Sequence, residues 1–345
     1  MKMKRKRLPT ISLAAVLALV VIPLLVGNVF GGGAAEPEEE QYHILFNGPM
    51  PEEHNLTKAA RMFAEIVEER TGGQVTVRVV PDAALGGGRE ALEAVRSGTQ
   101  TMVDAALAPI TAYEPAFGVL NLPYLFTSRE QWYGLLDGPL GTDLLERLED
   151  HGFVGLGYPE NGIRHVTNSV RPIETVEDME GINIRVMENP VFIEMFRRLG
   201  ASPTPIPWAE LYSALQQGVV GAQENPVVNI HGARLYEVQD YLSLTGHTYD
   251  ANIYFVNKDF YDRLPTEFQD VLRQAATEAI AWQRQQAQQD EQELLAEIEP
   301  YIEINEIDEE ELARFQEMLV PMYEAMKDEI GADVVEAWLK AVEDY

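Results

Sequence analysis

The sequence predicts an α/β protein with mostly parallel sheets flanked by helices, and three observations carry that prediction. Short β-branched or apolar runs alternate with helical segments between residues 42 and 107, and the same alternation restarts after residue 150. Residues 265–300 contain no internal proline or glycine and are rich in Ala, Gln, Glu and Leu. They predict one helix of about 50 Å at ~1.5 Å per residue. Because the alternation of strands and helices begins again after residue 150, we expect two sheets.

The first half of the chain begins as a β-α-β unit. Apolar side chains recur at helical spacing in residues 55–70, and Thr71-Gly72-Gly73 ends the helix before a β-branched run. In order, we expect a strand at 42–46, a helix at 55–70, a strand at 75–80, a helix at 89–96 and a strand at 102–107.

A helical stretch around residues 128–150 separates this unit from the second one. The same alternation of strands and helices predicts a second, mostly parallel sheet. Its expected elements are strands at 153–157 and 183–187, helices at 190–199 and 209–217, and a strand at 221–224.

Composition indicates a folded and strongly acidic protein. The 345 residues suffice for two domains, and 46% of them are hydrophobic. The formal net charge is −30, and removal of the five basic residues in segment 1–35 takes it to −35. Such a surface repels nucleic acid and anionic lipid, so we expect neither as a partner. The low lysine content beyond residue 35 fits a halophilic protein, with an ordinary acidic secreted protein as the alternative.

The N-terminal residues 1–35 are typical of an export signal. Basic residues at 2–7 precede an apolar run at 8–26 and a patch of small residues at 31–35. We therefore expect a periplasmic or extracellular protein, or a membrane-anchored one if the signal is not cleaved, because the run approaches the roughly 20 residues that span a bilayer. The chain has no cysteine, which excludes disulfides, thiolate metal sites and a lipoprotein anchor.

The stretch from Gly162 to Pro226 is the most informative part of the chain. Its segments, in order, are Gly-Ile-Arg164, Arg171-Pro-Ile, Asp178-Met-Glu-Gly-Ile-Asn-Ile-Arg185-Val, the run from Gly200 to Tyr212, and Gln223-Glu224-Asn225-Pro226. This ordered series resembles the substrate-binding subunits of tripartite ATP-independent periplasmic (TRAP) transporters, the DctP family. A weaker likeness extends from about Tyr42 to the C-terminus.

The resemblance implies a two-lobe fold like that of periplasmic binding proteins, with the long helix spanning both lobes. We expect one lobe at 41–161 plus 251–290, the other at 162–250 plus 291–345, and a cleft between them. The family captures small organic acids and delivers them to a permease with a small and a large membrane subunit. A monomeric binding protein that closes about a hinge, with no cofactor or metal and no catalytic group, is therefore expected.

Two arginines are the main candidates for ligand binding. Arg185 ends an apolar alternating segment near the carboxyl end of its strand, where ligands of open α/β sheets bind. A guanidinium offers a rigid fork of donors that matches a carboxylate. The resemblance implies that Arg185 grips the ligand carboxylate and that Arg164 is a second contact. For each arginine the alternative is an ion pair with an acidic residue of the protein.

Three further residues complete the predicted site. Asn225 precedes Pro226 at a strand end, from which its amide could donate to the carboxylate that Arg185 holds. The resemblance implies that Trp208 packs on the ligand, although a plain core tryptophan is the alternative. Asn47 follows the first strand and corresponds to a polar contact from the first lobe, with an Asx turn as its alternative.

The chain departs from the family pattern at places that bear on the ligand. Gly221-Ala222 replaces the usual Asp-Gly before Gln223. Gly86–Gly88 and residues 106–108 stand where some members carry acidic or hydroxyl contacts, so the far end of the ligand stays undetermined.

Other classes of function have less support in the sequence. The six histidines form no His-x-x-x-His pair and no Gly-x-Ser-x-Gly motif occurs, so neither a zinc site nor a serine hydrolase is indicated. Three alternatives remain open at this point: a zwitterionic solute such as ectoine as the ligand, an ATP-driven importer as the partner, and a secreted enzyme or sensor domain.

Overall fold

The computed structural model describes residues 40–345, so the predicted export signal lies outside the described residues. Ten strands are present in that part of the chain. They are β1 Tyr42–Asn47, β2 Val75–Val80, β3 Met102–Ala106, β4 Phe153–Gly155, β5 Glu160–Asn168, β6 Asn183–Val186, β7 Ser202–Pro205, β8 Ala222–Pro226, β9 Tyr241–Asn257 and β10 Glu303–Asn305.

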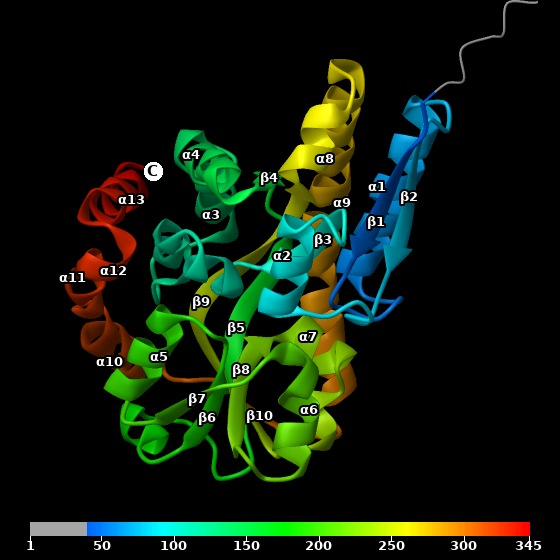
Figure 1. Ribbon diagram of the computed structural model, residues 1–345. Coiled ribbons are helices and arrows are strands. Elements are labelled where there is room, and N and C mark those ends of the chain that lie inside the picture. Colours follow the sequence, from blue (N-terminus) through cyan, green and yellow to red (C-terminus); the bar gives the residue numbers. More distant parts are fainter. Residues whose placement is uncertain (1–39) are drawn as a thin grey trace, which may run out of the picture. The chain divides into compact units, whose positions relative to one another are not determined.

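Helices connect and cover these strands (Figure 1). They are α1 Asn55–Arg70, α2 Gly88–Arg96, α3 Arg129–Leu136, α4 Pro139–Arg147, α5 Pro190–Arg198, α6 Trp208–Gln216, α7 Val227–Gly232, α8 Lys258–Arg263, α9 Thr266–Ile298, α10 Glu309–Leu319, α11 Met322–Ala325, α12 Lys327–Ile330 and α13 Ala332–Asp344.

Strand β9 joins two groups of strands into one continuous sheet. The strand order is β2-β1-β3-β9-β5-β8-β6-β7, and β4 and β10 also pair with β9. The 17 residues of β9 pair with β3 and β4 at its C-terminal end and with β5 along its N-terminal part. Because β9 belongs to both groups, side chains from both groups can face one site.

The pairing directions agree with the predicted β-α-β units and add an antiparallel centre. β1 pairs in parallel with β2 and β3, and β6 pairs in parallel with β7 and β8. The antiparallel pairs all involve β5 or β9. These two strands were not predicted as such, because polar residues interrupt the apolar alternation in both.

The long helix α9 confirms the prediction for residues 265–300, with 33 residues between Thr266 and Ile298. Its first half contributes Leu272 and Ala276 to a core shared with Phe63 of α1. Its end contributes Ile298 to a second core that includes Leu211 of α6. α9 therefore packs against elements of both predicted lobes, as Figure 1 shows.

The C-terminal helices pack on elements from both predicted lobes as well. Trp338 of α13 packs edge to face on Phe126, with 6.1 Å between ring centroids, whereas Phe315 of α10 shares a core with Phe192 of α5. The exact division of the chain into lobes stays a prediction. Within residues 40–345, none of the helices combines the length and apolar character needed to span a bilayer.

Candidate functional site

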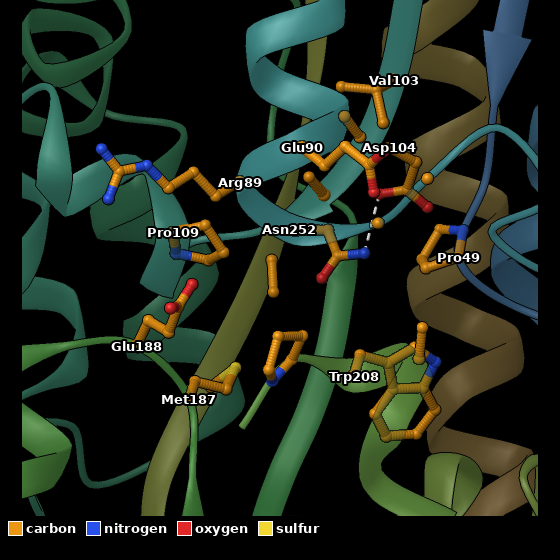
Figure 2. Close-up of a pocket in the computed structure, with 18 of the residues that line it drawn as sticks. Pro49, Arg89, Glu90, Val103, Asp104, Pro109, Met187, Glu188, Trp208 and Asn252 are labelled. Atoms are coloured by element: carbon orange, nitrogen blue, oxygen red, sulfur yellow. Dashed lines mark hydrogen bonds between the residues drawn. The ribbon is translucent and has the colours of Figure 1, made fainter. Parts of the chain in front are cut away.

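A cavity of about 230 Å³ lies where strand ends from the two groups of strands meet. This volume is just below the roughly 300–1,000 Å³ of pockets for drug-sized molecules, which favours a small ligand. Figure 2 shows part of its lining. The residues that the argument uses are Asn47, Gly86, Asp104, Arg185, Trp208, Asn225 and Asn252.

Arg185 enters the cavity from strand β6 and is 2% exposed. Its Nε donates to the carbonyl oxygen of Ile206 at 2.8 Å, which fixes the plane of the guanidinium. Its Nη1 is buried and has no hydrogen-bond partner among the described residues. No carboxylate of residues 40–345 forms an ion pair with it within 4.0 Å. Arg185 therefore does not form the internal ion pair that was the alternative interpretation.

Arg185 remains a cation at neutral pH. Burial lowers the pKa of its guanidinium to about 10, and the nearby Glu224 acts in the opposite direction. Glu224 is itself held by Arg164, and although burial opposes the effect, Arg164 keeps the pKa of Glu224 below its usual value. The site therefore presents a desolvated positive charge in the cavity lining, with Nη1 as a donor that no described residue engages.

Arg164 is not among the residues that line the cavity, and its predicted role as a direct ligand contact stays a prediction. It is fully buried, and it donates to both carboxylate oxygens of Glu224, through Nε to Oε2 and through Nη2 to Oε1, the latter at 3.0 Å. Its Nη1 donates to Asp250 Oδ2 at 2.7 Å. The strand order explains this: β5 lies between β8 and β9, which carry the two acids. Arg164 therefore forms the internal ion pairs that were its alternative interpretation.

Asn225 lines the cavity at the end of β8, as predicted. Its Oδ1 accepts from Nη2 of Arg164 at 3.1 Å, and its Nδ2 donates to Oε1 of Gln223 at 2.5 Å. One N–H of the amide is therefore engaged inside the protein and one remains. Arg164 thus helps to orient Asn225, which lines the cavity.

Trp208 and Asn47 also line the cavity, from opposite groups of strands. Trp208 is the first residue of α6 and is half-buried. Among residues 40–345 it is the only aromatic residue of the lining. Asn47 ends β1; its Nδ2 donates to the carbonyl oxygen of Gly86 at 2.8 Å. Its Oδ1 is buried without a partner in the described chain.

Comparison with known proteins identifies the family. The model of the family described as "Bacterial extracellular solute-binding protein, family 7" (DctP) matches residues 46–329. This chain belongs to the DctP family. The resemblance that the sequence suggested is confirmed.

Similar proteins bind different organic acids, according to their names. This DctP-family protein is 37% identical over 237 residues to the 2,3-diketo-L-gulonate-binding periplasmic protein YiaO of Escherichia coli, covering 69% of the chain and 72% of the relative. The sugar acid binding protein DctPAm of Advenella mimigardefordensis, solved with galactonate, is 35% identical, with a TM-score of 0.85 and coverage of 88% and 99%. A TRAP periplasmic solute binding protein of Sulfurospirillum deleyianum, solved with succinate, is 30% identical, with a TM-score of 0.83 and coverage of 88% and 99%. These neighbours confirm the two-lobe fold.

Four buried polar residues that line the DctP-family cavity were not predicted as site residues: Asp104, Asn161, Asn229 and Asn252. Asp104 of β3 is 2% exposed, and its Oδ1 accepts from Nδ2 of Asn252 on β9 at 2.7 Å (Figure 2). Burial raises the pKa of the Asp104 carboxyl to about 7. The signal that could have found Asp104 is a single acid inside an otherwise apolar strand, since an unpaired buried acid is rare outside functional sites.

The described part of this DctP-family chain holds no group of three or more His, Cys, Asp or Glu side chains arranged to bind a metal ion. Arg185 and Asp104 are the buried charged residues of the cavity lining, and Arg89, Glu90, Glu188 and Glu210 line it as exposed residues.

Proposed function

We propose that this DctP-family protein captures a small organic acid outside the cytoplasm and delivers it to the membrane subunits of a TRAP permease. The observation that carries this proposal is Arg185: a buried guanidinium, facing a cavity, with no acidic partner in the described chain. An isolated buried charge is costly, and the cost is offset when an anion arrives.

The proposed ligand contacts follow from the donors that remain free. Arg185 offers two parallel N–H bonds to a carboxylate, with its orientation fixed in advance by Ile206. The remaining N–H of Asn225 supports the same carboxylate, and Trp208 covers the ligand's carbon chain. Arg164 positions Asn225 and takes no part in direct contact.

Delivery requires a conformational change, which we place at the strands that link the two predicted lobes. Asn47 and Arg185 come from different groups of strands, so a ligand that contacts both favours the arrangement in which these groups are close. Closure also removes water and so strengthens the charged hydrogen bonds. In this proposal the closed monomer docks on the small and large permease subunits, and the lobes are those predicted from the sequence.

Other ligands and partners have weaker support. A cationic group of a zwitterion such as ectoine calls for a cage of aromatic rings, and in the described part of the chain Trp208 is the only aromatic residue that lines the cavity. Membership of the DctP family favours a TRAP permease over an ATP-driven importer and a binding role over catalysis.

Isothermal titration calorimetry tests the proposal with galactonate, D-erythronate and succinate as probes, all ligands of similar proteins. Wild type should bind at least one of them, and Arg185→Met should weaken that binding by about 100-fold or more, since roughly 3–5 kcal/mol is lost when one partner of a buried pair is removed. Arg70→Met is the matched control, because Arg70 is exposed and pairs with Glu278. Equal affinity of wild type and Arg185→Met would disprove the proposed site.

A further inference from the structure

The cavity has a second polar wall whose atoms differ in kind from those around Arg185. It consists of Asp104 on β3, Asn252 on β9 and Asn47 on β1, all of which are buried and line the cavity. Figure 2 shows Asp104 and Asn252 facing each other. We call these three residues the acceptor wall.

The hydrogen bonds within the acceptor wall engage one N–H of each asparagine amide and leave both amide oxygens without a partner. Asn252 donates Nδ2 to Asp104 at 2.7 Å, and Asn47 donates Nδ2 to the carbonyl oxygen of Gly86 at 2.8 Å. The Oδ1 atoms of both asparagines are buried and lack partners among the described residues. Exchanging the oxygen and nitrogen of the Asn47 amide would place two acceptors against each other, and the same holds for Asn252 when Asp104 is ionised.

Buried acceptors need donors, and no described residue donates to these two amide oxygens. The missing donors must come from the molecule that fills the cavity. A second carboxylate has only acceptors to offer when ionised, so it would be repelled by the ionised Asp104 and could not satisfy the two amide oxygens. A single ammonium places all its donors on one nitrogen, whereas the acceptor atoms are divided among three side chains on three strands. Hydroxyl groups on successive carbons provide one donor each.

Resting on the proposed function, we propose that Asp104, Asn252 and Asn47 determine specificity by accepting hydrogen bonds from the hydroxyl groups of the ligand, while Arg185 holds its single carboxylate. The ligand class is then the hydroxylated monocarboxylic acids. Asp104 and Asn252 reject dicarboxylates by the same contacts.

The test compares four acids with four carbons each, so that only the groups at the acceptor wall differ: D-erythronate with hydroxyls, butyrate with none, succinate with a second carboxylate, and 4-aminobutyrate with an ammonium. Galactonate, hexanoate, adipate and 6-aminohexanoate form the matching six-carbon set. Calorimetry at pH 8 should show wild type binding the hydroxylated acid of at least one set at least tenfold more tightly than its three partners.

Asp104→Asn keeps an oxygen for the Asn252 amide and replaces the free acceptor with a donor. This variant should lose at least tenfold in affinity for the hydroxylated acid and gain affinity for the dicarboxylate. Asn252→Ala removes an acceptor without adding a donor. It should weaken the binding of the hydroxylated acid and leave the affinities for the other acids unchanged. If either variant fails to fold, as judged by circular dichroism, the other decides.

The inference is overturned if wild type prefers a dicarboxylate or an amino acid, if neither hydroxylated acid binds, or if a folded Asp104→Asn protein keeps the wild-type order of affinities. Failure of the proposed function looks different: Arg185→Met would then bind as tightly as wild type. If Arg185→Met no longer binds any of the acids while Asp104→Asn keeps the wild-type order of affinities, the proposed function stands. The specificity role of the acceptor wall is then disproved.

Discussion

Arg164 donates from Nη2 to the side-chain oxygen of Asn225 at 3.1 Å. This hydrogen bond joins a residue outside the cavity to one that lines it. The two arginines predicted as ligand contacts therefore have separate tasks. Arg164 organises the interior through ion pairs, and Arg185 keeps its donors free. We therefore expect replacement of Arg164 to lower the stability of the ligand-free protein and replacement of Arg185 not to lower it.

Arg164→Met should lower the free energy of unfolding by about 3–5 kcal/mol, because it leaves the buried Glu224 and Asp250 without their cation. Urea denaturation followed by circular dichroism measures this. The exposed control Arg70→Met should change the free energy by no more than about 0.5 kcal/mol. A loss below about 1 kcal/mol at Arg164 would contradict the buried ion-pair network.

Arg185→Met should leave the free energy of unfolding of the ligand-free protein unchanged or raise it by up to about 2 kcal/mol. The physical reason is that methionine removes an unpaired buried charge at the expense of one hydrogen bond to Ile206. The same denaturation experiment without ligand measures it. A loss of more than about 3 kcal/mol would show that Arg185 has a structural partner.

Asp104 should make stability fall as pH rises. Burial raises the pKa of its carboxyl to about 7 from the model-compound value of 3.8, so between these pH values the folded state binds more protons than the unfolded state. Between pH 5 and pH 8 the wild type should therefore lose about 2–3 kcal/mol relative to Asp104→Asn. Urea denaturation of both proteins at the two pH values measures this difference. A constant difference would mean that Asp104 does not titrate in this range.

Trp208 should report ligand binding by fluorescence, because it is the only tryptophan that lines the cavity. Adding a bound acid should change the emission of wild type, and Trp208→Phe should lose most of that change. Trp208→Ala should weaken binding about tenfold, in line with roughly 1 kcal/mol for an aromatic contact. Trp282→Phe is the control, since Trp282 is a partly buried residue of α9 that does not line the cavity. An unaltered signal in Trp208→Phe would place the ligand elsewhere.

The sequence carried the local features of the fold well. Residues 55–70 form α1 as predicted, and the helix predicted at 265–300 is α9. Strand β9 was missed, because buried polar residues such as Ser243, Asp250 and Asn252 replace the expected apolar side chains. These residues make side-chain hydrogen bonds that a pattern of hydrophobicity does not contain.

The site residues that could be predicted are those that lie in a recognisable local sequence segment. Arg185 and Trp208 lie in recognisable segments and do line the cavity. The internal ion pairs of Arg164 could not be assigned from the sequence, because its partners Glu224 and Asp250 lie 60 and 86 residues away in the chain. Asp104 was missed for a similar reason: its partner Asn252 is 148 residues distant, and only the pairing of β3 with β9 brings them together.

Strand β9 limits how such proteins can be recombined. Its N-terminal part pairs with β5 and its C-terminal part with β3 and β4, so a crossover inside this strand separates residues that complete two different sets of pairings. Chimaeras between relatives should therefore inherit Tyr241–Asn257 from a single parent, together with the strands that flank it. A new binding wall is better introduced by exchanging individual side chains than by exchanging halves of the gene.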